Sequence, residues 1–95
     1  MAALGILETR GYSAAVEALD AMCKDARVSV REVRRPGGGH IALLIEGEVA
    51  AVTSAVEAGT VSAQRVGGEL IFSNIIANPH KGLAEYLERE LSRNG

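Results

Sequence analysis

The sequence predicts a small α+β domain in which four strands and two helices follow one another as strand, helix, strand, strand, helix, strand. Two observations carry this prediction. Short apolar runs alternate with segments whose apolar residues repeat at helical spacing, and glycine or proline separates most of these segments. Hydrophobic residues make up 47% of the 95 residues and the formal net charge is -2, a composition typical of globular proteins. We therefore expect one domain over residues 1–95.

The first half of the chain supplies a strand, a helix and a second strand. The run Ala3–Thr9 is short and mostly apolar, which is typical of a strand, and Gly11 follows its end. From Tyr12 onward the apolar residues recur at helical spacing while the charged residues fall largely outside their stripe, which predicts an amphipathic helix. The stripe consists of Ala15, Val16, Leu19, Met22, Cys23 and Ala26. The segment Val28–Val33 alternates apolar and polar residues with a slip of one position, which indicates a half-exposed strand with a β-bulge.

The second half repeats this pattern and adds a helix. Ile41–Ile45 is almost wholly apolar, as expected of a strand inside a sheet, and Glu46–Glu48 is expected to turn the chain into a second helix. Gly67–Gly68 ends that helix, and Leu70–Ile76 is expected to form the fourth strand. The apolar face of the second helix consists of Val49, Val52, Val56, Ala63 and Val66. Beyond Asn78–Pro79 a short terminal helix is expected, with Leu83, Leu87 and Leu91 at helical spacing.

This order of elements is the split arrangement of ferredoxin-like domains, here with an added carboxy-terminal helix. The fold hosts ligand sensors, RNA binders, iron–sulfur carriers and assembly proteins, so the residues must decide among them. Phe72 is the only aromatic residue on the expected strands, too few for base stacking, and the mild acidity (pI about 5.6) also argues against nucleic acid. The single Cys23 excludes an internal disulfide or a cysteine cluster, and we expect it to be a small buried hydrophobe.

The sequence also argues against a membrane protein. No apolar run approaches the ~18 residues that a membrane span needs, and the amino terminus lacks the pattern of a signal peptide. We therefore expect a cytosolic protein.

The segment Arg35–His40 carries three consecutive glycines between two expected strands. A tight hairpin needs only one or two special residues, so the excess predicts that bare backbone approaches a ligand, another chain or a symmetry axis. The alternative is a flexible surface loop. A phosphate-binding loop is disfavoured, because such a loop runs from a strand into the amino terminus of a helix and this one joins two strands.

No catalytic or metal site is evident in the sequence. His40 and His80 are the only histidines, and neither has a nucleophile nearby or the spacing of a metal site. Nothing in the spacing of Glu8 or Asp20 pairs either carboxylate with a base. We therefore predict neither an enzyme nor a cofactor.

Five segments, taken in order along the chain, carry a resemblance to a known family: Ala3–Gly11, Glu17–Val28, Gly37–Gly39, Glu46–Val52 and Pro79–His80. Together they extend over nearly the full length of the chain. In their order and spacing the chain resembles the hexamer-forming, single-domain shell proteins of bacterial microcompartments (the BMC-H type). The resemblance implies a structural protein with the BMC domain fold, located in the shell of a microcompartment in the bacterial cytoplasm. It also implies flat hexamers that tile edge to edge into facets, together with other shell proteins and around encapsulated enzymes.

The same resemblance implies a pore at the sixfold axis. Its residues would be Arg35, Pro36, Gly37, Gly38, Gly39 and His40. Gly38 matches the central position, where many relatives carry Ser, so this chain offers no hydroxyl there. The backbone would line a narrow opening for polar or anionic metabolites. Arg35 would favour anions, and His40 would make that preference depend on pH if it faces the channel.

The resemblance finally assigns contacts at the hexamer edge. Lys24 matches the edge lysine of relatives, Pro79 and His80 also match the family pattern, and Asn78 stands where relatives usually carry Arg. Asn reaches less far than Arg, so we expect weaker or differently angled lateral contact.

One alternative to the shell protein is a ferredoxin-like module that senses or regulates through a small molecule, as a dimer or trimer.

Overall fold

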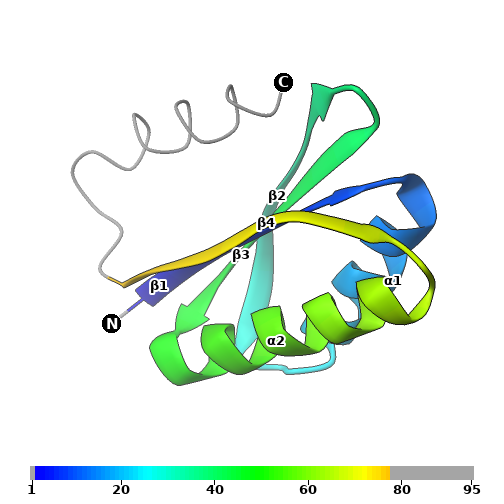
Figure 1. Ribbon diagram of the computed structural model, residues 1–95. Coiled ribbons are helices and arrows are strands. Elements are labelled where there is room, and N and C mark those ends of the chain that lie inside the picture. Colours follow the sequence, from blue (N-terminus) through cyan, green and yellow to red (C-terminus); the bar gives the residue numbers. More distant parts are fainter. Residues whose placement is uncertain (1, 78–95) are drawn as a thin grey trace.

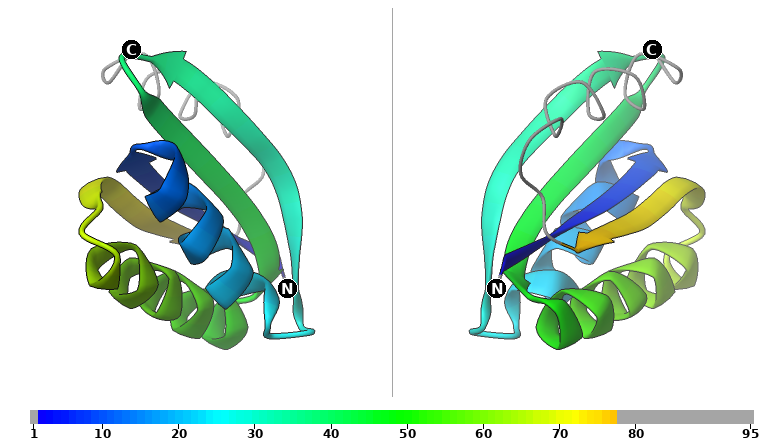
Figure 2. Two further views of the ribbon diagram at one scale, coloured as in Figure 1. Left: turned by 90° about the vertical axis from the view of Figure 1, so that its right-hand side faces the viewer. Right: turned by 90° about the vertical axis from the view of Figure 1, so that its left-hand side faces the viewer.

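The computed structural model describes residues 2–77, and the elements follow the expected order (Figure 1). They are β1 (Ala2–Arg10), α1 (Tyr12–Cys23), β2 (Val28–Gly37), β3 (His40–Glu48), α2 (Val49–Arg65) and β4 (Glu69–Ala77). The strands form one antiparallel sheet in the order β2-β3-β1-β4. Both helices cover the same face of this sheet (Figure 2). This is the ferredoxin-like arrangement; the expected terminal helix with Leu83, Leu87 and Leu91 lies outside the described residues.

The main core lies between the sheet and the two helices, and it is built largely from small side chains. Gly5 of β1 allows α2 to approach closely, because a Cβ atom there would lie 2.7 Å from Val52 Cγ1 and 2.9 Å from Val56 Cγ2. Gly59 does the same between the helices, where a Cβ would lie 2.8 Å from Met22 Cγ. The helices can therefore pack tightly without the large aromatic side chains that this chain lacks.

A second apolar cluster lies on the opposite face of the sheet. Leu4 and Ile6 of β1 and Ala42 and Leu44 of β3 are fully buried there, and β4 packs against them with Phe72 and Ile76. β1 is thus buried on both faces, which explains why its sequence is almost continuously apolar instead of alternating.

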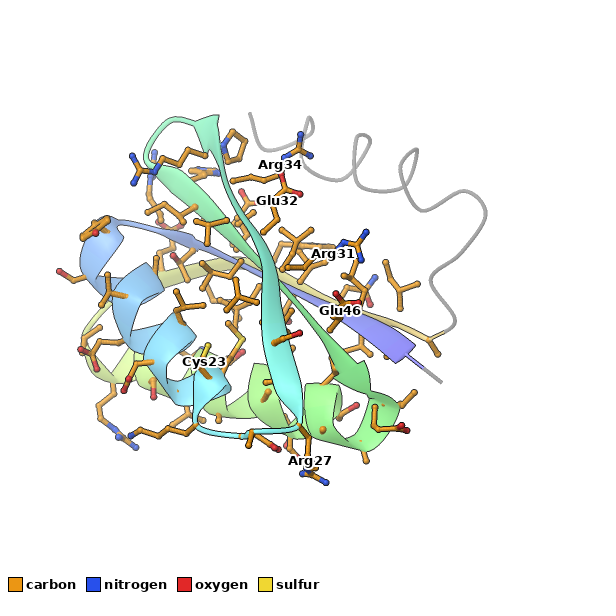
Figure 3. All side chains as sticks on the ribbon, turned by 180° about the vertical axis from the view of Figure 1, so that it is seen from behind. Cys23, Arg27, Arg31, Glu32, Arg34 and Glu46 are labelled. Carbon is orange, nitrogen blue, oxygen red and sulfur yellow. The ribbon has the colours of Figure 1, made fainter. Side chains whose placement is uncertain are left out.

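The β-bulge that the sequence predicts in β2 is present. Val30 pairs with Ile45 and Glu32 pairs with Leu44, so Arg31 is the extra residue. The guanidinium of Arg31 lies 3.4 Å from a carboxylate oxygen of Glu46 on β3 (Figure 3). The slip in the alternation of β2 is therefore the sequence mark of the bulge.

The structure corrects the expected face of α1. The buried residues are Ala14, Ala15, Ala18 and Met22, one turn or less apart, while Val16 is exposed. Cys23 is also exposed, because it is the last residue of the helix, beyond the contact that Met22 makes with the core (Figure 3). Ala26 lies outside the helix. The prediction of a buried cysteine was wrong.

Two further expectations change in the second half. β3 continues through Glu48, and α2 begins at the next residue, so Glu46–Glu48 is strand and not a turn. Gly47 permits this pairing, because a Cβ there would lie 2.5 Å from the carbonyl oxygen of Arg27. Val49 and Val66, which the sequence places on the apolar face of α2, are both exposed, and Val66 follows the end of the helix.

Candidate functional site

The segment Arg35–His40, here called the glycine hairpin, is more ordered than the expected loop. β2 includes Arg35, Pro36 and Gly37, β3 begins at His40, and only Gly38 and Gly39 form the turn. The hairpin lies at the end of β2 and β3 that points away from α2 (Figure 1). All the residues that the family resemblance implies for a pore are therefore at one tip of the sheet.

The backbone conformation accounts for the three glycines. Their φ angles are 132° at Gly37, 62° at Gly38 and 79° at Gly39, all in the region that side chains with a Cβ rarely adopt. A two-residue hairpin turn of type I′ has positive φ at both of its residues, as Gly38 and Gly39 do, and the second register shift of β2 lies between Arg34 and Gly37. Within the chain there is room, since a Cβ on Gly38 would meet nothing closer than His40 Cδ2 at 3.8 Å. The excess of glycine thus has a local cause, and no neighbour is needed to explain it.

Two contacts tie the hairpin to the rest of the sheet. The N–H of Gly11, just before α1, donates to the carbonyl oxygen of Gly39 over 2.9 Å. His40 Nδ1 lies 2.9 Å from an oxygen of Glu8, whose side chain is completely buried in β1. The two residues are 32 positions apart, so no local pattern in the sequence pairs them. The mark of the pair in the sequence is the acidic Glu8 on an apolar strand, where it follows Leu4 and Ile6 on the same face.

Three arginines lie near the hairpin, and two of them have acidic partners. Arg10 lies 3.6 Å from Glu69 and Arg34 lies 3.0 Å from Glu32, so each of these guanidinium groups has an acidic partner (Figure 3 labels Arg34 and Glu32). Arg35 is exposed. A hollow of about 280 Å³ at the foot of the hairpin is lined by Gly11, Tyr12, Arg35, Gly37, Gly39, His40 and Ile41.

An apolar patch begins beside this hollow and extends over α1 and β2. It consists of Tyr12, Val16, Val30 and Val33, which are 67%, 45%, 41% and 46% exposed. A depression of about 220 Å³ within it is lined by residues of α1, β2 and β3, among them Leu19 and Arg35. β2 is an edge strand of the sheet. Such a patch on an edge is typical of a surface that another chain covers.

The expected edge residue Lys24 directly follows α1. Its ammonium lies 3.7 Å from Asp20, and both side chains are largely exposed. The backbone after it is fixed by Asp25, which accepts hydrogen bonds from the backbone N–H and the guanidinium of Arg27. These hydrogen bonds, the side-chain one above all, lower the pKa of Asp25 to about 2. A groove of about 870 Å³ runs from here along α2, over Ser54, Ala58 and Ser62.

The other edge residues, Asn78, Pro79 and His80, lie outside the described residues. Within residues 2–77 there is no group of three acidic, histidine or cysteine side chains that could hold a metal ion. No helix in the same range is long and apolar enough to cross a membrane.

Residues 3–79 match the BMC domain. The chain belongs to the BMC domain family. The carboxysome shell protein CsoS1A of Hydrogenovibrio crunogenus is 46% identical over 88 residues, which are 93% of this chain and 92% of the relative. The bacterial microcompartment shell protein EutM of Salmonella typhimurium is 47% identical over 85 residues, 90% and 88% of the two chains. The predicted family is thus confirmed, and the chain is a shell protein of this family.

A solved structure supports the same assignment for the fold. A microcompartment protein from Desulfitobacterium hafniense superposes with a TM-score of 0.74 at 34% identity, over 92% of this chain. The chain spans about half of that protein (47%). The predicted α+β BMC domain fold is therefore confirmed.

Proposed function

We propose that this shell protein forms a hexameric ring that tiles into the facets of a microcompartment, with the glycine hairpin gathered at the sixfold axis as a pore. The observation that supports the ring most directly is the apolar patch of Tyr12, Val16, Val30 and Val33. In a ring, the contact between neighbours extends outward from the axis. The patch has this form, because it starts at the foot of the hairpin and continues along α1 and β2.

Burial of the patch in a ring would also add to the stability of the subunit. The core of the subunit is thin and rich in alanine, so the free energy that it supplies is modest for a chain of this size. Covering four large apolar side chains that are 41% to 67% exposed would add roughly 25 cal/mol for each Å² of apolar surface removed from water. A closed ring covers this surface equally in every subunit.

The hairpin suits the lining of a narrow opening. Gly38 and Gly39 present backbone without side chains at the tip, so six copies can approach one axis. The exposed guanidinium of Arg35, repeated six times, would favour polar or anionic metabolites over cations. The proposed role is passage and enclosure, not catalysis, and it uses no cofactor.

The rim of the hexamer would carry the lateral contacts. Lys24 is exposed at the end of α1, and the Asp25–Arg27 hydrogen bonds hold the turn beside it in one conformation. A long aliphatic stem with a terminal ammonium can pack against a neighbouring hexamer and donate to its backbone carbonyls. Asn78, Pro79 and His80 complete the proposed edge. Partners would be neighbouring hexamers and other shell proteins, with encapsulated enzymes on one side of a shell in the bacterial cytoplasm.

The mass of the purified protein in solution tests the ring. Size-exclusion chromatography with light scattering should give a hexamer, and Val33→Asp should convert it to smaller species by placing a charge in the apolar patch. Val66→Asp is the matched control, because Val66 is 48% exposed and Val33 46%, yet Val66 lies outside the patch. A wild-type monomer at all concentrations would contradict the proposal. A dimer or trimer that depends on a small molecule would favour the sensor instead.

A further inference from the structure

We propose that buried Glu8 fixes the tautomer of His40 and so gives the glycine hairpin a proton-controlled hydrogen-bonding group next to its turn. The role in transport rests on the proposed pore. The role of Glu8 in the subunit does not, and the two can be tested separately.

The imidazole of His40 lies between the buried carboxylate and the turn. Its Nδ1 atom is 2.9 Å from Glu8, and its Cδ2 atom would be 3.8 Å from a Cβ on Gly38. Nδ1 and Cδ2 lie on opposite sides of the ring. One side of the ring therefore contacts Glu8, and the other side lies next to the turn.

With Glu8 in its charged form, this placement decides which ring nitrogen of His40 exchanges its proton. A charged carboxylate only accepts hydrogen bonds, so the 2.9 Å contact between charged Glu8 and neutral His40 places a hydrogen on Nδ1. The proton that His40 gains or loses is then the one on Nε2. Nε2 is bonded to Cδ2 and so belongs to the side of the ring that faces Gly38. At high pH this atom accepts a hydrogen bond, and at low pH it donates one and carries positive charge.

The surroundings of His40 bury its acidic partner but leave the His40 ring partly open to solvent. Glu8 is completely buried, and a buried carboxylate needs hydrogen-bond donors, whereas the His40 side chain is 16% exposed and can exchange protons with solvent. Pro36 has no N–H, and Arg35 and Pro36 have no partners in the register of β2 and β3. The tip of the hairpin thus depends on contacts such as those of His40 and Gly39 for its position.

Other charged groups share this part of the molecule. On the same sheet face, Arg10 of β1 pairs in register with His40 and also contacts Glu69 of β4; Arg34 of β2 contacts Glu32. Arg35 and Tyr12 line the hollow that His40 also lines. These groups set a largely constant background, because histidine is the side chain whose charge ordinarily changes between pH 5 and 8.

Nitrogen NMR of the histidine rings tests the tautomer directly. The chain has two histidines, so a His80→Gln variant leaves His40 alone in the spectrum. At pH 8 or above, His40 should carry its hydrogen on Nδ1, which is the minor tautomer of a free imidazole. A ring that carries it on Nε2 would overturn the proposal, whether the protein is a hexamer or a monomer.

The coupling to the turn is measured in the same protein. Selective ¹⁵N-glycine labelling reports the eleven glycines, and the Gly38 and Gly39 amide shifts should follow the titration of His40. Gly47 at the far end of β3 is the control and should not follow it. His40→Gln can still donate to Glu8 but does not titrate, so it should fold and abolish the inflection. The proposal would also be overturned if the Gly38 and Gly39 amide shifts did not follow the titration of His40, or if they still showed the inflection in His40→Gln.

Transport shows whether the group acts in the pore. In reconstituted shells, passage of a small anion relative to a neutral solute of similar size should rise by about tenfold as the pH falls through the His40 titration, since six positive charges appear together. His40→Gln should give a flat profile. If the tautomer and glycine results hold but the flux ratio is flat in both proteins, the hairpin does not line the transport route, and the proposed pore fails while the Glu8–His40 assignment stands.

Discussion

Replacement of Gly38 tests whether the glycine hairpin is set by its own backbone or by neighbouring subunits. Gly38 has a φ angle of 62°, and a Cβ there would meet nothing closer than 3.8 Å within the chain. Gly38→Leu therefore adds conformational strain of about 1–2 kcal/mol without a clash. Gly38→Asn should cost less, because Asn tolerates the left-handed region. Both losses are smaller than the usual stability of a domain, about 5–15 kcal/mol, so both variants should fold.

Thermal unfolding and transport assays measure the two effects of these variants. At roughly 4–8 °C per kcal/mol for a domain of this size, Gly38→Leu should lower the unfolding midpoint by about 4–16 °C, and Gly38→Asn by clearly less. Both should remain hexamers by light scattering. In reconstituted shells the six leucines should block a polar solute, whereas the six asparagines should pass it.

Two results would refute this reasoning. If Gly38→Asn folds with wild-type stability but no longer forms hexamers, crowding between subunits requires the glycine and the φ angle does not. If Gly38→Leu forms hexamers and passes polar solutes at the wild-type rate, the glycine hairpin is not the route of transport.

Four other predictions concern the edge of the hexamer and the fold of the subunit. Lys24→Asp should keep hexamers but abolish sheets in electron micrographs, and Lys24→Ala is the control that separates loss of the ammonium from charge reversal. Sheets that persist unchanged would show that Lys24 is an ordinary surface residue. Asn78→Arg should increase sheet formation at matched salt, because Arg donates more hydrogen bonds over a longer reach, and unchanged sheets would indicate another edge geometry. The pKa of Asp25 is about 2 in the folded protein and about 3.9 in an unfolded chain, so its stabilising effect is complete above about pH 4 and is lost as the pH falls toward 2; carboxyl NMR should show the low value, and Arg27→Ala should return it toward the usual range. Gly47→Ala should destabilise by about 1–3 kcal/mol in urea unfolding, because its Cβ meets a backbone oxygen at 2.5 Å that side-chain motion cannot relieve, and an unaffected midpoint would contradict the strand pairing there.

The sequence by itself determined the order of the elements and the family. The apolar runs at Ala3–Thr9 and Ile41–Ile45 and the helical stripes between them reflect local periodicity, which survives in the sequence because burial imposes it. The slip in β2 marked a real bulge at Arg31. The positions of Gly38 and Gly39 also marked the turn, since positive φ is a local demand.

The sequence was less informative about which side chains are covered. Val16 and Cys23 continue the apolar stripe of α1, yet both are exposed, because the sheet and α2 cover only the side with Ala14, Ala18 and Met22. The helical spacing shows which residues form an apolar face, but it does not show how much of that face the sheet and the other helix cover. Of these two exposed residues, Val16 is part of the apolar patch.

Only the tertiary structure could bring Glu8 to His40. They are 32 residues apart, and their contact depends on the antiparallel register of β1 and β3, which pairs Arg10 with His40 and places both even-numbered residues on one face of the sheet. A register change of one residue would turn either side chain to the opposite face. Local sequence patterns determine each strand, but the pairing between strands follows from the packing of the whole sheet, and the chemistry at the foot of the glycine hairpin follows from that pairing.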